Sequence, residues 1–367
     1  MYFSVFRCMQ GYFSKYIHHI DRDNNMDLIR YVLAFSVLIG HFNYLCGADI
    51  PWIISTHNRV GVFFAMSGFV LVGGMLKGQP YSTFVKKRIW RICPSYFFVI
   101  IISAFLLAFI SPLGLYDYFT DSGLYKYLIA NLSFLNFLHP DLPGLFEDCV
   151  NNAVNGSLWT MKVEWQLTLT APILIWLIKK YRLSLIKITV FIIVSSLAYK
   201  LLFNYMYLEN GRKIYEILGR QFMGQTFFFY TGILIYCYYE QFKRRLPLLI
   251  IVSGIIYCIF CIVESDIYNQ LFQPLVITIF FMGLSLLPKN LARYIDGGNN
   301  ISYEIFLCHY PIIQLTNHYG LMERHGTILT FIFVVIATLA FATITYITAG
   351  RLYKYKNRKK VYLSVPS

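Results

Sequence analysis

The chain has 367 residues, of which 57% are hydrophobic and only 14% are charged, and its mean hydropathy is +0.55. These values exclude an ordinary soluble domain and predict an all-α, polytopic membrane protein. The 32 Lys and Arg against 18 Asp and Glu would suit a nucleic-acid-binding protein, but the basic residues gather in short loops between apolar runs. That distribution is typical of membrane topology, so we expect a lipid bilayer and no nucleic acid as partner.

Ten apolar segments are long enough to cross a bilayer. They lie at residues 28–46, 58–76, 93–111, 158–178, 185–203, 222–239, 246–263, 268–287, 301–319 and 328–350. An eleventh candidate, residues 124–139, is shorter and more polar. If it does not cross and the N-terminus is cytoplasmic, the inner segments hold 23 Lys and Arg and the outer loops hold 7. This asymmetry favours ten spans with both termini inside, and a re-entrant or interfacial helix at 124–139.

The chain shows no internal repeat and no separate globular region. We expect a single transmembrane domain at residues 1–350, with a cytoplasmic segment at 1–26, and a basic cytoplasmic tail at 351–367. The first 25 residues lack the apolar core of a cleaved signal peptide, so the first span is expected to be the anchor. The eight cysteines show no CxxC or Cys/His spacing. We expect them to be small core residues and predict no metal site.

The first apolar segment carries Arg30 and His41, eleven residues apart. In a helix this spacing is about three turns, so the two side chains share one face and lie ~16 Å apart along the axis. Ionisable residues in a membrane span are costly and mark functional sites by default. The alternative is that Arg30 reaches the headgroups and His41 makes a helix-packing hydrogen bond.

Two further spans carry charged residues in patterns suited to binding. Arg88 and Arg91 are three residues apart, so they share a helical face at the expected cytoplasmic end of the third span. Guanidinium groups donate paired hydrogen bonds, and such a pair suits phosphates. Ordinary positive-inside anchoring would also place arginines there. Glu164 lies about two turns inside the fourth span, close to the expected outer surface, with Trp159 as an interfacial aromatic.

The ninth span holds a second intramembrane histidine, His309, preceded by Tyr303 and followed by Pro311, which frees a backbone carbonyl. His309 is a candidate for binding the acceptor or the donor, or it is a packing histidine. The second span contains Ser67 among several glycines, a composition that indicates close helix packing. The outer loop at residues 112–157 is acidic and aromatic, and would serve either as a lid or glycan-contacting surface or as a solvated connector.

Five segments in this order resemble the acyltransferase-3 family of bacterial integral membrane acyltransferases. They are the Arg/His pair eleven residues apart, GVFFAMSGFVL, FVKKRIWRICPSY, SLWTMKVEW and ISYEIFLCHYPI. The resemblance covers residues 26–350. It implies transfer of an acyl group, usually acetyl, from cytoplasmic acyl-CoA to hydroxyls of extracytoplasmic glycans such as O-antigen, capsule or exopolysaccharide. It also implies the bacterial cytoplasmic (inner) membrane, acyl-CoA as a donor rather than a bound cofactor, and the standalone form of the enzyme.

By resemblance, Arg30 and His41 correspond to the family's essential pair in the first span, and Arg88 and Arg91 to its Arg-x-x-Arg pair. Glu164 and His309 correspond to the glutamate and histidine of the fourth and ninth spans. We expect the arginines to hold the donor phosphates and His41 to act as general base, or to be acylated itself. Glu164 would orient its imidazole.

Two positions depart from the family pattern, Lys162 and the stretch 166–168, and both are expected on the acceptor side. Tyr303, Ser67 and Trp159 remain candidates for the acceptor or a secondary site. The competing hypothesis is a polysaccharide or lipid-linked sugar exporter whose polar intramembrane residues line a transport path. A third is a scaffold in a glycan-assembly complex. The paired arginines and the absence of repeats favour the enzyme.

Overall fold

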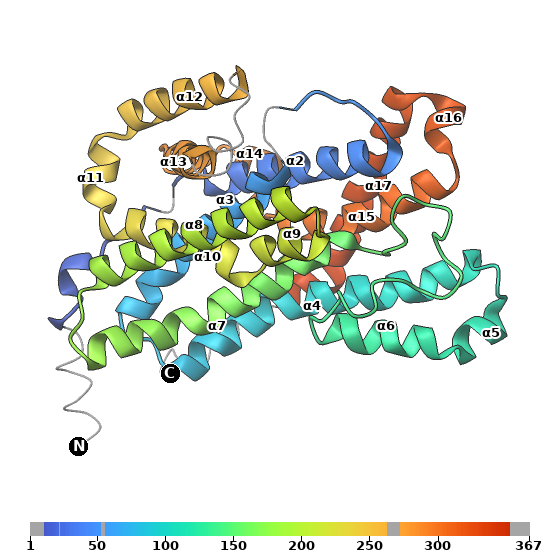
Figure 1. The fold of residues 1–367 in the computed structure, drawn as a ribbon, viewed down its shortest axis with the longest axis horizontal. Coiled ribbons are helices and arrows are strands. Elements are labelled where there is room, and N and C mark those ends of the chain that lie inside the picture. Colours follow the sequence, from blue (N-terminus) through green and yellow to red (C-terminus); the bar gives the residue numbers. More distant parts are fainter. Residues whose placement is uncertain (1–10, 22, 53–55, 263–271, 353–367) are drawn as a thin grey trace, which may run out of the picture. The chain divides into compact units, whose positions relative to one another are not determined.

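The computed structural model describes residues 11–21, 23–52, 56–262 and 272–352 (Figure 1). Within these ranges the chain is helical and forms no strand, apart from one isolated bridge between Asn24 and Pro288. The expected all-α class is therefore confirmed for the described part of the chain.

Ten helices lie at the ten apolar segments. They are α2 (Met26–Cys46), α3 (Thr56–Leu76), α4 (Tyr81–Leu107), α7 (Trp159–Lys180), α8 (Leu185–Asn210), α10 (Phe222–Cys237), α12 (Leu246–Ile262), α13 (Gln273–Ser285), α15 (Ser302–His318) and α17 (Thr327–Thr345). The shorter helices are α5 (Leu115–Thr120), α6 (Ser122–Leu132), α9 (Lys213–Arg220), α11 (Tyr239–Arg244), α14 (Arg293–Asp296) and α16 (Leu321–His325). Single turns are η1 (Ser14–Tyr16), η2 (Ala108–Ile110), η3 (Gly156–Leu158) and a π-helical turn, η5 (Tyr346–Gly350).

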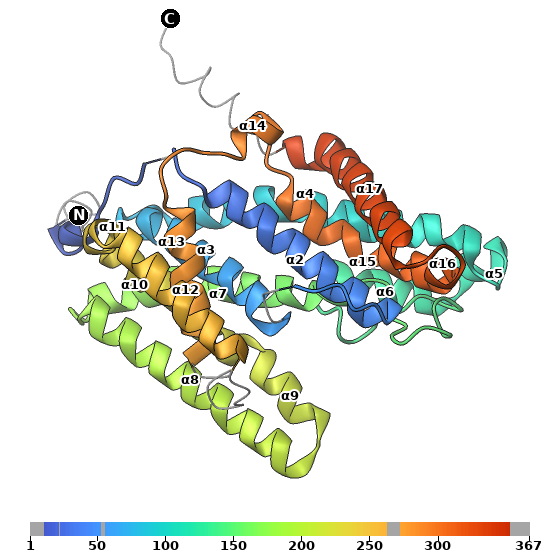
Figure 2. The ribbon, with the colours of Figure 1, turned by 90° about the horizontal axis from the view of Figure 1, so that it is seen from above.

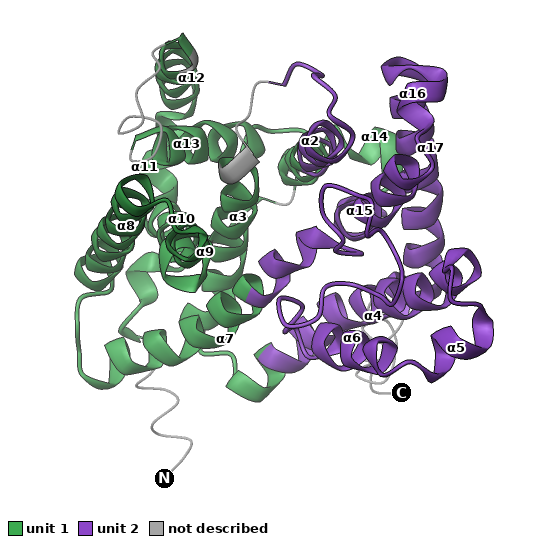
Figure 3. Ribbon diagram, turned by 45° about the vertical axis from the view of Figure 1, so that its right-hand side comes forward, with its two compact units in different colours: residues 1–33, 53–84, 163–298 green, residues 34–52, 85–162, 299–367 purple. Residues whose placement is uncertain are grey.

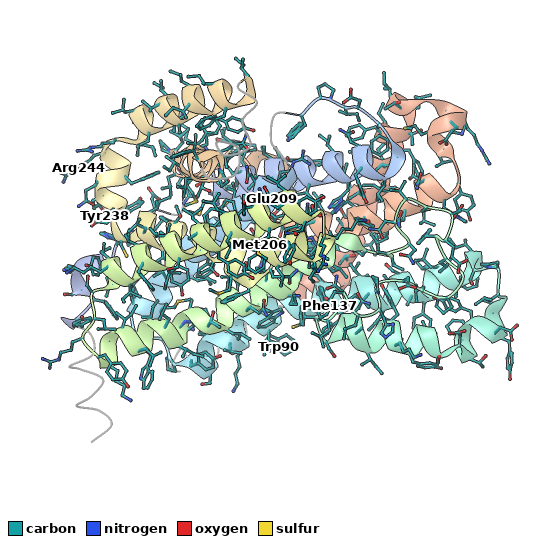
Figure 4. The ribbon with its side chains drawn as sticks, viewed as in Figure 1. Trp90, Phe137, Met206, Glu209, Tyr238 and Arg244 are labelled. Atoms are coloured by element: carbon teal, nitrogen blue, oxygen red, sulfur yellow. The ribbon has the colours of Figure 1, made fainter. Side chains whose placement is uncertain are left out.

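Five helical stretches of the described chain are long and apolar enough to cross a membrane. They are Met26–Cys46, Asn58–Leu76, Tyr81–Ile110, Leu185–Asn210 and Thr327–Gly350. Apolar rings also lie exposed on the surface, among them Trp90 at 38% and Phe137 at 57%, both labelled in Figure 4. Exposed apolar surface of this kind suits a chain surrounded by lipid. The structure thus supports a membrane protein, while ten crossings and the orientation of the termini stay predictions.

The segment 124–139 forms a helix over only part of its length. Helix α6 has eleven residues, about 16 Å, roughly half the thickness of the hydrocarbon core. It ends where Phe134 adopts a left-handed φ of 60° and Asn131 donates a hydrogen bond to the His139 carbonyl oxygen. Asp121 caps its start by accepting from the Gly123 amide. A helix this short does not cross a bilayer on its own.

Helix α4 begins twelve residues before the apolar run that predicted it. The polar stretch before Cys93 contains no residue that breaks a helix, so the helix continues through both arginines to Tyr81. Arg88 and Arg91 therefore lie inside a regular helix, on the common face that their spacing predicts.

The chain divides into two compact units (Figure 3). Unit 1 comprises residues 1–33, 53–84 and 163–298, and unit 2 comprises residues 34–52, 85–162 and 299–367. Helices α2, α4 and α7 each run from one unit into the other. The candidate residues are consequently shared between the units, with Arg30, Ser67 and Glu164 in unit 1.

Unit 1 is built on helices α3, α8 and α10, which pack along their lengths. Figure 2 shows α8 beside α9, and α12 beside α13, in the same unit. Glycines permit the closest approach. A Cβ at Gly68 would lie 2.0 Å from the Phe229 carbonyl oxygen, and one at Gly232 would lie 1.9 Å from that of Ala65. The prediction that the small residues of the second span serve close packing is confirmed.

Unit 2 has its core where α2, α15 and α17 meet. Leu38 and Phe42 of α2 pack with Tyr310 and Ile313 of α15 and with Val334 of α17, and each of these side chains is at most 1% exposed. The apolar faces follow helical spacing on each element. This packing places the middle of α15 directly against the C-terminal half of α2.

Candidate functional site

The two histidines of the predicted first and ninth spans meet in unit 2. The ring of His41 stacks on that of His309, with centroids 5.2 Å apart and planes inclined by 28°. The ring of Tyr310 lies edge-on to the His41 imidazole, with the two ring centroids 5.0 Å apart. Two helices far apart in sequence therefore bring together the residues that the sequence singled out in the first and ninth spans.

His309 is fully buried, and its two ring nitrogens differ in their surroundings. Nδ1 lies 3.3 Å from the carbonyl oxygen of Ile305, one turn earlier in α15. A carbonyl only accepts, so this contact places the proton on Nδ1 and leaves a lone pair on Nε2. Among the described residues Nε2 has no hydrogen-bond partner. A buried acceptor without a partner costs free energy, which suggests a site adapted to receive a donor group.

The carbonyl freed by Pro311 has a partner that the sequence did not reveal. Proline at position 311 cannot donate to the Leu307 oxygen four residues earlier, and the Nδ2 of Asn155 donates to it instead, at 2.8 Å. The Oδ1 of Asn155 accepts from the Ser157 amide at 3.2 Å, capping η3 at the start of α7. Asn155 is buried and fixes the beginning of α7 against the histidine-bearing helix.

Gly156, the next residue, is confined by Tyr310. A Cβ at Gly156 would lie 2.6 Å from the phenol oxygen of Tyr310. The Asn-Gly-Ser sequence before the fourth span was the available signal, because asparagine is a favoured N-cap and glycine permits close approach. Asn155 and Gly156 are thus positioning residues that sequence reasoning missed.

The N-terminal turn of α15 is tied to α4 beside Arg91. The Tyr303 hydroxyl donates to the Ile92 carbonyl oxygen at 3.0 Å, and the Ser95 hydroxyl donates to Oε1 of Glu304 at 2.8 Å. Glu304 is only 3% exposed. These bonds fix the register of α15 against the helix that carries the paired arginines. Tyr303 therefore has a structural contact in addition to the acceptor role proposed for it.

Arg88 and Arg91 are both half-buried on α4. Trp159, also half-buried, begins α7. Lys162 places its ammonium 4.3 Å from the centre of the Phe137 ring, a cation–π contact in unit 2. This contact stabilises the charge of Lys162 and does not involve the histidine pair.

The remaining candidates belong to unit 1. Arg30 forms an ion pair with Asp27, one turn earlier in α2, at 2.9 Å. Glu164 is 9% exposed and accepts from the Thr168 hydroxyl at 3.5 Å. Ser67 is half-buried on α3. Because Glu164 and His41 belong to different units, the predicted role of this carboxylate in orienting the imidazole stays a prediction.

Unit 1 also contains a cavity of about 460 Å³ between the end of α3, the start of α4 and the end of α7. Its walls are mainly apolar, with Tyr81, Phe84 and Trp176 among them, and Gln79 and Lys179 supply polar groups. Nothing in the sequence pointed to this cavity, because its walls come from three separate segments.

The family model described as an acyltransferase domain matches residues 23–347. The O-acetyl transferase of Shigella phage Sf6 is 24% identical over 178 residues, which cover 47% of this chain and 52% of that protein. Nodulation protein 10 of Rhizobium leguminosarum is 25% identical over 177 residues, covering 45% and 47%. O-acetyltransferase OatA of Staphylococcus aureus is 23% identical over 352 residues, covering 88% and 55%. The chain spans about half the length of these relatives, and no solved structure matches it.

Proposed function

The chain belongs to the acyltransferase-3 family, and on that premise we propose that it transfers an acyl group, in the first instance acetyl, from cytoplasmic acyl-CoA to a hydroxyl of an extracytoplasmic cell-surface glycan. Two relatives are named as O-acetyltransferases. These names support acetyl as the acyl group and an oxygen atom as its acceptor. We place the protein in the bacterial cytoplasmic membrane, with ten spans.

The observation that carries the proposal is the contact between His41 and His309 in unit 2. Two imidazoles 5.2 Å apart, one of them with a buried Nε2 that has no hydrogen-bond partner among the described residues, place a base and a hydrogen-bond acceptor side by side. A buried histidine that only stabilised packing would normally have both nitrogens satisfied.

In the proposed reaction His41 removes the proton from the acceptor hydroxyl. The hydroxyl oxygen then attacks the thioester carbonyl carbon, the carbon–sulfur bond breaks, and the CoA thiolate leaves with the proton that His41 returns. In the alternative route His41 itself attacks the thioester, the carbon–sulfur bond breaks and the CoA thiolate leaves. The acceptor hydroxyl then attacks the acylated His41, the acyl–nitrogen bond breaks, and the hydroxyl proton passes to the thiolate. In both routes the lone pair of His309 Nε2 accepts a hydrogen bond from a neighbouring hydroxyl of the acceptor, which holds the reacting oxygen near His41.

Acyl-CoA is too highly charged to cross the bilayer, so its phosphates are proposed to bind at the cytoplasmic end of α4. Arg88 and Arg91 share a face of that helix and supply paired donors for phosphate oxygens. Arg30 lies on α2, about 16 Å along the helix from His41. That length suits a pantetheine arm running from phosphates near Arg30 to a thioester at the histidine. Glu164 keeps the orienting role that the resemblance implies.

The test uses inverted membrane vesicles, radiolabelled acetyl-CoA and glycan from the same cells. Wild type is compared at matched expression with His41→Ala and with His325→Ala, which removes an exposed histidine of α16. We expect label in the glycan for wild type and the control, and a 10²–10⁴-fold or greater loss for His41→Ala, the range for removing a general base. Arg88→Ala should then raise the KM for acetyl-CoA.

The opposite pattern would support the exporter. If His41→Ala vesicles acetylate glycan at the wild-type rate while movement of glycan across the membrane stops, the acyltransferase assignment is wrong. Transfer by wild type that does not require acetyl-CoA would retain the enzyme but overturn the proposed donor.

A further inference from the structure

Three potential metal ligands meet at the outer end of α15 in unit 2, away from the histidine pair. The Nδ1 of His318, the last residue of α15, lies 3.1 Å from Oδ1 of Asp148. The Sγ of Cys149 lies 3.8 Å from the same carboxylate oxygen. All three ligand atoms lie within 4.8 Å of one another. We propose that Asp148, Cys149 and His318 form a zinc-binding site.

The separations agree with a tetrahedral zinc site. Bonds of about 2.0–2.3 Å at tetrahedral angles put neighbouring ligand atoms roughly 3.3–3.6 Å apart. The observed nitrogen–oxygen and sulfur–oxygen distances lie on either side of this range. The Asp148 oxygen therefore lies at a suitable distance from both other ligand atoms, and the Sγ–Nδ1 separation, which is within 4.8 Å, would close to about 3.6 Å around an ion.

The donor set selects the kind of metal. A thiolate and an imidazole together favour zinc over magnesium and calcium, which prefer oxygen ligands alone. Three protein ligands leave the fourth position of a tetrahedron for water. The side chains of Asp148 and His318 are 62% and 28% exposed, so an ion and its water ligand have access from solvent.

Hydrogen bonds and ring contacts join the two segments that carry the three ligands. The loop that follows Cys149 is bound along α15, because the Nε2 of Gln314 donates to the Ala153 carbonyl oxygen at 2.8 Å and Asn155 bonds to Leu307. Phe146 packs edge-on against the His318 ring at 5.7 Å. Ligands held on two segments that are themselves joined need little reorganisation to bind an ion.

The local electrostatics are compatible with this role. The hydrogen bond from His318 lowers the pKa of the Asp148 carboxyl, so the carboxylate is available as a ligand at neutral pH. Burial raises the pKa of the Cys149 thiol to about 11, with the Asp148 charge as a further cause. A cysteine binds zinc as its thiolate, so the Cys149 proton leaves when the ion binds.

Sequence spacing predicted no metal site, because the cysteine and the histidine stand 169 positions apart and only the fold unites them. A zinc ion here would fasten the outer loop to the helix that carries His309, and so hold the start of α7 in place. The proposal does not depend on the proposed acetyl transfer, since zinc is measured without substrate.

The experiment measures metal in full-length protein purified in detergent, stripped with chelator, equilibrated with Zn²⁺ and separated from free ion. Wild type should retain one zinc per chain, whereas Cys149→Ser and His318→Ala should retain at least tenfold less. Cys258→Ser removes an exposed cysteine of α12 and should bind as wild type does. Elution volume and helical circular dichroism show whether each variant is folded.

A second readout identifies the thiolate directly. Co²⁺ in place of zinc gives a sulfur-to-cobalt charge-transfer band in the near ultraviolet, which should appear in wild type and Cys258→Ser and be absent from Cys149→Ser. If wild type binds no metal, or if folded Cys149→Ser keeps both its zinc and the band, the Asp148–His318 contact is an ion pair only and the proposal is wrong.

Discussion

Substitution of Asn155 should destabilise the protein strongly, because this side chain serves two helices. In Asn155→Ala the Leu307 carbonyl freed by Pro311 loses its donor, and the start of α7 loses its cap. A buried group left without a partner costs about 1–3 kcal/mol. An N-cap contributes about 0.5–2 kcal/mol. Because Asn155 is 5% exposed, water does not replace it, and we expect a loss of about 2–4 kcal/mol.

Pro311→Ala separates the two contributions. An alanine at position 311 has an N–H that donates to the Leu307 oxygen within the helix, so in this background Asn155→Ala should cost only its cap, about 1 kcal/mol. The double-mutant cycle should therefore give a coupling of about 1–3 kcal/mol between two residues 156 positions apart.

Unfolding by SDS titration in mixed micelles measures the stability of the wild type, of both single variants and of the double variant. Asn152→Ala, an exposed neighbour, is the matched control and should change stability by less than about 0.5 kcal/mol. Equal costs of Asn155→Ala in both backgrounds would refute the reasoning.

Three further substitutions test helix packing within the two units. Gly156→Ala should displace Tyr310, whose phenol oxygen would lie 2.6 Å from the new methyl group, and lower acetyl transfer with little change in the KM for acetyl-CoA; an unchanged rate would contradict this. Gly68→Ala would force α3 away from α10 and should leave little folded protein on size-exclusion chromatography. Ser95→Ala removes one hydrogen bond from buried Glu304 and should cost about 1–3 kcal/mol in the same SDS titration, with helix content preserved.

The sequence predicted the helices well because apolar length is a local property. Each of the ten apolar segments coincides with a helix, and the polar extension of α4 was missed because hydropathy identifies a span and not the helix that contains it. The short α6 was also foreseen, since its polarity lowers the local hydropathy. Helix boundaries and the division into two units depend on contacts between distant segments, which hydropathy does not encode.

The sequence predicted which residues belong to the candidate site, but not which residues they contact. Titratable residues are unusual within apolar segments, and this property identified His41 and His309 separately. Their stacking requires the register of α2 on α15, which the apolar core of unit 2 sets. Asn155 was missed for a related reason: a freed carbonyl is visible in the sequence as Pro311, but the residue that binds it can lie anywhere in the chain. The same holds for His318 as a ligand.

Helix α15 explains how these features depend on one another. Its contacts occur at successive turns: Glu304 to α4, Leu307 to Asn155, His309 to α2 and Gln314 to the outer loop. Rotating or sliding the helix by one residue would break all of them together. The position of the His309 imidazole is therefore fixed by contacts along the whole helix, as the proposed transfer between two bound substrates would require. Weakening any one of these contacts should consequently reduce catalysis even where it lies a full turn or more from the reacting atoms.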